Sequence, residues 1–451
     1  MLGLLVATTT ASRSAQAQNA GEQPPFRPPP VSDPMLAPPP APPRQVRSWD
    51  EALALLRAHS PDYITSYESV LRAEAQSRIA LAAILPNLSA QGSYVHQFLT
   101  ETLALGPPPA PSFVTPVPDT LTASGVLQWN VLSPRAIYAV GTADENVKVA
   151  QATFEDRRRM IALTVVNAML STLAASRVAD LNRTGLRSAL ERRVLTQTRL
   201  QFGQGTPLDV DRAEQDVAAA RAQLITGDES LRQAREALGA ALGSTIPVAA
   251  PGDLSLDEFE AAVARTCHLN EDLERRPDVV AARLRAEVAE RGVHDSELLF
   301  SPSVAVSSQL ATANVAIFAP LTTWGAGAVL TVPLYDGGAR YGALRDSRAA
   351  LEQARQALVT TRISAVVSAA QAQRAVSVYE DSRKVAQEQR DLAARIDQRT
   401  RDGYARGAGT SLDLVVSAQS LRQADINLVL LQVQVGEARA GAVLASAECI
   451  Y

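Results

Sequence analysis

The eight residues GQGTPLDV, from Gly203 to Val210, recur as GAGTSLDL, from Gly407 to Leu414, about 200 positions later. A heptad pattern follows each copy in the same register, and in it large apolar residues alternate with small ones. This alternation is typical of a helix that packs closely against another helix. Two units with one turn sequence and one register indicate the duplication of a large structural module.

The composition favours long helices over a compact globular core. The chain has 451 residues, of which 46% are hydrophobic, 20% charged and only 4% aromatic. Such a chain can bury apolar surface, and the scarcity of aromatic residues suits thin, closely packed helices. The net charge is −4 and no run of five like charges occurs, so the sequence gives no reason to expect nucleic acid binding.

The chain divides into five predicted segments. Residues 1–17 are expected to be a signal peptide, because a short apolar stretch precedes an Ala-x-Ala pattern; no basic residue precedes that stretch, which fits a translation start further upstream. Residues 18–47 are a proline-rich, disordered leader. Residues 48–243 and 277–451 are two helix–hairpin–helix repeats, and residues 244–276 link them.

Within each repeat, two segments change from a helical period to a period of two. The segments are 88–98 and 121–131 in the first repeat, and 303–311 and 325–334 in the second. Each has one apolar face and one polar or small face, and each is about 9 to 11 residues long, the length a tilted strand needs to cross a bilayer. Because no run of 18 apolar residues occurs, we expect strands, not helices, to cross a membrane.

The remaining segments of each repeat predict very long helices, at about 134–202 and 339–401, each reversing at a glycine turn into a second long helix. The predicted fold class is therefore mainly α with a small β part.

Four strands cannot close a barrel, and a membrane does not tolerate open sheet edges. Three copies would give twelve strands, whereas two would give eight and no useful pore. We therefore expect a homotrimer with a 12-stranded transmembrane β-barrel, four strands per chain.

Several motifs resemble the TolC-like outer membrane efflux factors, including their NodT-type branch but without a lipidated cysteine. They are Arg276-Pro277-Asp278, Phe300-Ser301-Pro302-Ser303, the PLYDGG run at 333–338 and the two GxGTxLD turns. The resemblance covers nearly all of residues 48–448. The first repeat has Val131-Leu132-Ser133-Pro134 instead of PLYDGG, so we expect its bend from strand to helix to be made differently.

The resemblance implies a passive export channel for small molecules in the outer membrane. Its barrel would continue into a long antiparallel coiled-coil tunnel through the periplasm. Its partners would be a periplasmic adaptor (a membrane fusion protein) and an inner-membrane pump. Two alternatives remain open on the sequence: a type I protein-secretion duct, and a periplasmic coiled-coil scaffold or adaptor that never enters a membrane.

The two turns supply the candidate functional residues. Asp209 and Asp413 occupy equivalent positions in the first turn of a helix, where the helix dipole alone favours an acid; the functional alternative is a threefold ring of carboxylates. The resemblance matches Tyr404 to the gate tyrosine of the family and Asp209 to its partner acid. Some relatives carry a basic residue where this chain has Gly409 and a second acid where it has Val416. Both charges are missing here, so the nearby cations Arg401 and Arg406 are candidate substitutes for the basic residue.

The glycines of the turns, Gly203, Gly205, Gly407 and Gly409, let the chain reverse between antiparallel helices. The resemblance adds that these tips would dock an adaptor.

No catalytic or metal-binding pattern accompanies the repeats. The four histidines are scattered, and no HExxH, Walker or GxGxxG motif occurs. Cys267 and Cys449 lie far apart and neither belongs to a CxxC, so we expect Cys267 to be an inert thiol beside His268. The sequence therefore predicts neither an enzyme nor a resident cofactor or metal.

Overall fold

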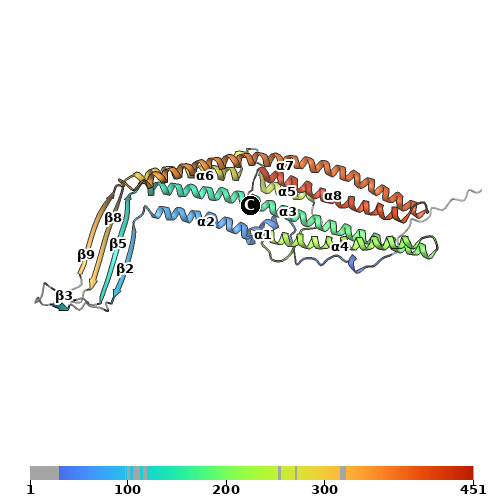
Figure 1. The fold of residues 1–451 in the computed structure, drawn as a ribbon, viewed down its shortest axis with the longest axis horizontal. Helices are drawn as coiled ribbons and strands as arrows, with labels where there is room; N and C mark the ends of the chain where they lie inside the picture. Colours follow the sequence, from blue (N-terminus) through green and yellow to red (C-terminus); the bar gives the residue numbers. More distant parts are fainter. Residues whose placement is uncertain are drawn as a thin grey trace, which may run out of the picture.

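A computed structural model of the protein describes residues 30–96, 98, 102–104, 112–114, 119–251, 255–269, 272–314 and 321–449. The predicted signal peptide, the first part of the leader and most of the proline-rich loop between the first two strands lie outside the described residues. Long helices run side by side as a rod, and a sheet of long strands turns away from one end of it (Figure 1).

The order of elements repeats once along the chain. In the first repeat these are α1 (Trp49–His59), α2 (Pro61–Ala82), β2 (Asn87–Val95), β5 (Thr120–Leu132), α3 (Pro134–Gln201) and α4 (Pro207–Ala241). In the second they are α6 (Pro277–Glu297), β8 (Ser303–Asn314), β9 (Leu321–Thr331), α7 (Ala339–Ala405) and α8 (Ser411–Ser446). The prediction of a duplicated, mainly helical chain with a small β part is confirmed.

Short elements lie near the middle of the rod and in the loops. The leader contains η1 (Pro34–Leu36) and β1 (Arg44–Gln45), and the first loop contains β3 (Thr102–Ala104) and β4 (Ser112–Val114). The linker contains β6 (Val248–Ala249), α5 (Leu256–Thr266), β7 (Cys267–Leu269) and η2 (Leu273–Arg275); η3 (Leu298–Phe300) and β10 (Ala447–Cys449) complete the set. Strand β1 pairs with β6, and β7 pairs with β10.

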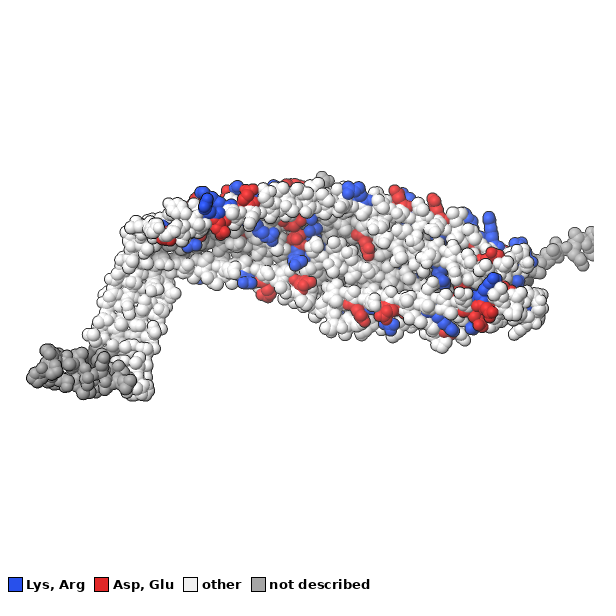
Figure 2. Space-filling model, in the orientation of Figure 1, with Lys and Arg blue, Asp and Glu red and all other residues white. Residues whose placement is uncertain are grey.

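The four long strands form one antiparallel sheet in the order β2-β5-β8-β9. The register places apolar residues opposite one another, such as Leu88 opposite Leu127 and Leu310 opposite Trp324. It also places polar residues opposite one another, such as Gln91 opposite Ser124. Opposite residues in a pair share a face, so the sheet has one mainly apolar and one mainly polar face. None of these strands contains a charged residue, and the sheet is uniformly white in Figure 2.

The bend from strand to helix differs between the repeats, as expected. Before α7, the Asp336 carboxylate accepts from the backbone nitrogens of Gly338 (3.1 Å) and Arg340 (3.0 Å), and Gly337 and Gly338 have φ of 71° and 92°. Before α3, the Ser133 hydroxyl accepts from the backbone nitrogen of Ala136 at 3.3 Å, after a register shift at the end of β5. A side-chain cap therefore replaces the glycine bend in the first repeat.

The largest apolar core lies where the two repeats meet at mid-rod, and it includes Trp49, Leu56, Met169 and Leu170. Two helices are long and apolar enough by composition to span a membrane, Pro134–Gln201 and Ser411–Ala445, so the expectation that no helix would qualify is wrong. Half of the apolar window of the first helix and a third of that of the second are buried inside the chain. The apolar runs of these helices therefore supply this core.

Cys267 is not the free thiol that the sequence predicted. It is buried and disulfide-bonded. The chain has one other cysteine, Cys449, which is the register partner of Cys267 across β7 and β10. The spacing in the sequence hid this pairing, because the whole second repeat lies between the two positions.

Candidate functional site

The two glycine turns lie next to each other at the end of the rod farthest from the sheet (Figure 1). Gly203 and Gly407 have φ of 70° and 77°, which favours glycine. A side chain at Gly205 would approach the backbone nitrogen of Leu200 at 3.2 Å, and one at Gly409 would approach that of Tyr404 at the same distance. These contacts support the chain-reversal role; docking of an adaptor here stays a prediction.

Each turn leads into a capping box. The Thr206 hydroxyl accepts from the Asp209 backbone nitrogen at 3.3 Å, while the Asp209 carboxylate accepts from the Thr206 backbone nitrogen at 3.0 Å. Thr410 and Asp413 form the same two bonds, at 3.2 and 3.1 Å. Both acids therefore stabilise the start of their own helix, as the sequence predicted for an acid in a first turn.

Of these two acids, only Asp209 also bonds to the other repeat within the described part of the chain. Its Oδ1 accepts a hydrogen bond from the hydroxyl of Ser411. The position equivalent to Ser411 in the first repeat is Pro207, which has no hydroxyl, so Asp413 cannot receive the corresponding bond. The pKa of Asp209 is lowered, first by the bond from Ser411, and the pKa of Asp413 is lowered first by that from Thr410. Duplication followed by divergence has left one acid of the pair bridging the two tips.

A second bridge joins the tips through Arg199, which no pattern in the sequence marks. Its guanidinium lies over the ring of Tyr404, 4.0 Å from Cζ to the centroid. Its Nη2 donates to the carbonyl oxygen of Tyr404 at 2.8 Å, at the C-terminal end of α7, where that oxygen also accepts from the backbone nitrogen of Gly407 at 3.1 Å. Tyr404 is only 6% exposed. The family resemblance pointed to Asp209 as the partner of Tyr404, but the structure pairs Tyr404 with Arg199 and Asp209 with Ser411.

The two candidate cations, Arg401 on α7 and Arg406 directly after it, remain within their own hairpin. Arg401 pairs with Asp397 at 2.7 Å, and Arg406 donates to the carbonyl oxygen of Asp402 at 3.1 Å. Beside them is a cavity of about 410 Å³ between α3 and α7, whose lining includes Arg199, Leu195 and Tyr404. The contacts between the two tips are thus hydrogen bonds and one cation–π contact, which can break without leaving a deeply buried charge.

Within the described part of the chain, no group of three or more His, Cys, Asp or Glu residues could hold a metal ion. The polar groups at the tips are matched to one another and to the backbone, an arrangement suited to holding two helix pairs together.

The comparisons with known proteins agree with this geometry. The sequence pattern of the family described as "Outer membrane efflux protein" matches residues 53–244 and 268–444, one match in each repeat. The chain belongs to this family, whose members are outer membrane efflux channels and not enzymes. The predicted family and location are thereby confirmed.

Two curated relatives are resistance proteins. The chain is 28% identical to the fusaric acid resistance protein FusA of Burkholderia cepacia over 313 residues, which is 65% of this chain and 56% of FusA. It therefore spans little more than half the length of FusA. It is 26% identical to the cobalt-zinc-cadmium resistance protein CzcC of Cupriavidus metallidurans over 339 residues, 70% of this chain and 76% of CzcC.

Solved outer membrane channels share the fold. The outer membrane protein VceC of Vibrio cholerae superimposes with a TM-score of 0.71 at 19% identity, covering 88% of this chain and 96% of VceC. The CmeC outer membrane channel of Campylobacter jejuni gives 0.74 at 14% identity, covering 88% and 84%. CusC gives 0.74 at 16% identity, covering 88% and 91%.

Proposed function

We propose that three copies of this chain form the outer membrane channel of a tripartite efflux system, a passive conduit for small molecules. The open sheet carries this proposal. Among the described residues, strands β2 and β9 each have a neighbouring strand on one side only, and an unpaired strand edge is not tolerated in a bilayer. Pairing of β9 with β2 of the next copy would close the sheet, and three copies reach twelve strands.

The two faces of the sheet fit opposite sides of a barrel wall. The apolar side chains Leu88, Leu127, Leu310 and Trp324 are exposed in the single chain and would face lipid. The opposite face presents uncharged amides and hydroxyls, among them Gln91, Gln128 and Gln309, which would line a water-filled pore. An uncharged wall holds cations and anions equally weakly, which suits a conduit.

The helical rod carries a matching seam. Helix α7 packs against α6 and α8 on one side, while an apolar stripe along it is exposed: Val359, Ile363, Val366, Val378, Val385, Leu392 and Ile396. Helix α2 exposes Ile64, Tyr67, Leu71 and Ile79, and α4 exposes Leu208 and Ile225. Packing of α7 against α2 and α4 of the next copy would bury these stripes, as heptad spacing requires.

The oligomer can be tested on the full chain in detergent. We expect a light-scattering mass of three chains and discrete conductance steps in planar bilayers. Leu392→Asp places a charge in the seam and should dissociate the trimer, whereas Gln387→Glu, on another face of α7, should not. A monomer with no conductance at any protein concentration would overturn the proposal.

The cargo and the partners are inferred from relatives. FusA and CzcC are named for resistance to a small organic acid and to metal ions, which favours small solutes over secreted proteins. A periplasmic adaptor and an inner-membrane pump would complete the pathway. Deletion of the gene should raise the sensitivity of the cell to small toxic compounds, whereas loss of a secreted protein with unchanged sensitivity would favour the protein-secretion duct.

The tips would form the gate at the periplasmic end. In this proposal the Arg199–Tyr404 and Asp209–Ser411 bridges hold α7 and α8 against α3 and α4 in the closed channel. Asp413 faces solvent and would contribute negative charge to the mouth, while Arg406 remains bound to its own helix end. Movement of α7 and α8 relative to α3 and α4 would then open the tunnel.

A further inference from the structure

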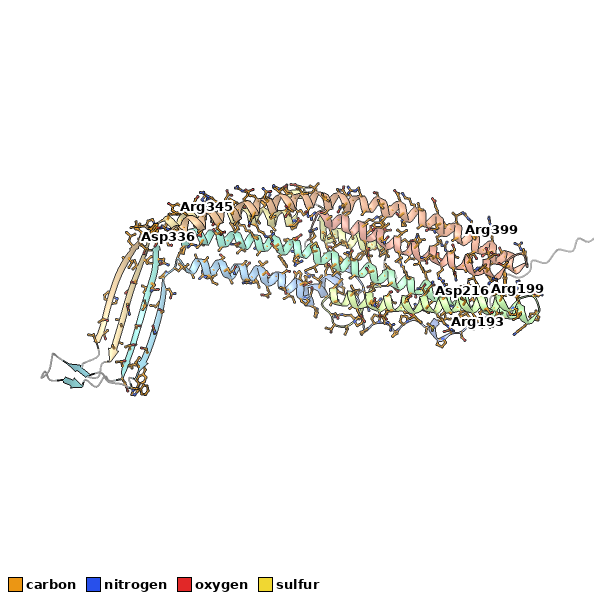
Figure 3. All side chains as sticks on the ribbon, viewed as in Figure 1. Arg193, Arg199, Asp216, Asp336, Arg345 and Arg399 are labelled. Carbon is orange, nitrogen blue, oxygen red and sulfur yellow. The ribbon has the colours of Figure 1, made fainter. Side chains whose placement is uncertain are left out.

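Another polar contact between the repeats lies deeper in the rod than the tips and is centred on Asp216, whose side chain is 0% exposed. Its Oδ2 accepts two hydrogen bonds from Arg192, one of them from Nε at 3.1 Å. Its Oδ1 accepts from the side-chain amide of Gln419 at 3.0 Å. Arg192 and Asp216 belong to α3 and α4, whereas Gln419 belongs to α8, so only the bond to Oδ1 crosses between the repeats (Asp216 is labelled in Figure 3).

Arg422 lies on α8 three residues after Gln419. Its side chain is half-buried against α3 at Gly185, where an added Cβ would come within 2.6 Å of the Arg422 Cδ and 2.8 Å of its Nη1. Within the described residues, no hydrogen bond or ion pair to Arg422 is found. Burial lowers the pKa of Arg422; the negative charge of Asp216 opposes this effect, and the positive charge of Arg192 adds to it. Arg422 is therefore a half-buried cation that lies three residues from Gln419, the residue of α8 that bonds to the buried carboxylate of Asp216.

Gln419 and Arg422 are spaced so that a shift of α8 could replace one by the other as the donor to Asp216. Residues three apart lie on the same side of a helix, about 4.5 Å apart along its axis. Asp216 is fixed in place by Arg192, which belongs to the same helix pair. Movement of α8 by less than one turn along α3 and α4 would bring Arg422 to the position that Gln419 now occupies.

We propose that Asp216, Gln419 and Arg422 form a two-position latch between the helix pairs, with the amide of Gln419 on Asp216 in the closed channel and the guanidinium of Arg422 on Asp216 in the open one. This inference rests on the proposed function, because it presumes a channel that opens by movement of α7 and α8. Because the Asp216 carboxylate is fixed and has two alternative partners, α8 has two discrete positions relative to α3 and α4. A packed rod can switch between two such positions, one in the closed state and one in the open state. Asp216 acts here as a positioning residue.

The latch predicts opposite effects for neighbouring substitutions. Gln419→Leu and Gln419→Glu both remove the closed-state bond, the second by placing a like charge beside Asp216. Either should raise the open probability of single channels in planar bilayers about tenfold, the effect of one hydrogen bond to a charged group. Arg422→Met removes the open-state bond and should lower the open probability by a similar factor. Matched controls are Gln423→Leu on α8 and Arg399→Met on α7, which should leave it unchanged.

The outcomes separate this inference from the proposed function. If the wild-type trimer never conducts, the channel itself is wrong. If the wild type conducts but the Gln419 and Arg422 variants change in the same direction, or neither differs from its control, the latch is wrong. Circular dichroism melting and the light-scattering mass of each variant exclude loss of the fold or of the trimer as the cause; Gln419→Glu gives a second reading if Gln419→Leu fails to fold.

Discussion

The guanidinium of Arg199 lies 4.0 Å from the ring centroid of Tyr404, although the two residues stand 205 positions apart in the sequence. One belongs to each repeat, so the contact joins the two helix pairs at their tips. The same guanidinium also donates to the carbonyl oxygen of Tyr404. A cation–π contact contributes about 0.5–1 kcal/mol when exposed and about 2 kcal/mol when desolvated. The Arg199 side chain is half-buried over a buried ring, so we expect its contacts with Tyr404 to change the equilibrium between a closed and an open tip about tenfold.

Removal of this contact should open the channel. Arg199→Met keeps the aliphatic stem but loses both the charge over the ring and the bond to the carbonyl, so we expect the open probability in planar bilayers to rise about tenfold. Tyr404→Leu should have the same direction of effect. Tyr404→Phe is the control, because the ring remains and no hydrogen bond of the Tyr404 hydroxyl is found among the described residues. An effect of Tyr404→Phe as large as that of Tyr404→Leu would assign the contact to the hydroxyl instead.

The duplication supplies a matched control for Asp209. Asp209→Ala and Asp413→Ala each remove one capping box, but only the first also removes a bond to the other repeat. We therefore expect similar small losses of thermal stability for both, and increased conductance for Asp209→Ala alone. Ser411→Ala should reproduce the increase without touching a cap. Equal conductance changes for the two aspartate variants would mean that the bridge to Ser411 does not hold the tips.

The pH dependence of the Asp209 bridge has a definite sign. The bond from Ser411 lowers the pKa of Asp209 below its usual 3.8. A group with a lowered pKa contributes its stabilisation above the usual value and loses it as the pH falls through the lowered value. The closed state should therefore be unaffected between about pH 8 and 5, with opening below about pH 4. Opening that begins near pH 6 would point to a different group, and Asp209→Asn should abolish the response below pH 4.

Much of the fold could be predicted because it is periodic. A heptad seam predicts a helix pair, and two turns with the same eight-residue pattern indicated that the unit occurs twice. The strands could be predicted from their period of two. For β9 the prediction was 325–334, whereas the strand runs from Leu321 to Thr331. Its early end is explained by Pro333, which cannot donate a hydrogen bond to the sheet.

Contacts between the repeats were not predictable from either repeat alone. Arg199 is one of many arginines in a helical pattern, and its position over Tyr404 depends on how two rods lie against each other. The same holds for Asp216 and Gln419, and for the disulfide of Cys267. The one available signal was the replacement of Pro207 by Ser411 between the two turns, which marks where the copies diverged.

The disulfide should stabilise the middle of the rod. Cys267 is buried in the mid-rod core and disulfide-bonded, and a disulfide in a folded protein typically contributes about 2–4 kcal/mol. We expect Cys267→Ser to lower the melting temperature measured by circular dichroism. A reducing agent should lower that of the wild type to the same level and leave the variant unchanged. A melting temperature of the wild type that does not respond to reduction, with complete loss of the disulfide verified by mass spectrometry, would contradict a stabilising role.

Gly243 should be intolerant of any side chain. It has a φ of 74°, and an added Cβ would lie 2.2 Å from the carbonyl oxygen of His59, a backbone atom that cannot rotate away. Strain in this region and overpacking each cost about 1–3 kcal/mol, so Gly243→Ala should lose about 2–6 kcal/mol of stability and lower the melting temperature clearly. Gly292 is the control, since a Cβ there meets nothing within 4 Å and its place within α6 favours alanine by about 0.5–1 kcal/mol. Equal melting temperatures for the two variants would show that the backbone around His59 can move aside, and that the junction between α1 and α4 is looser than this contact implies.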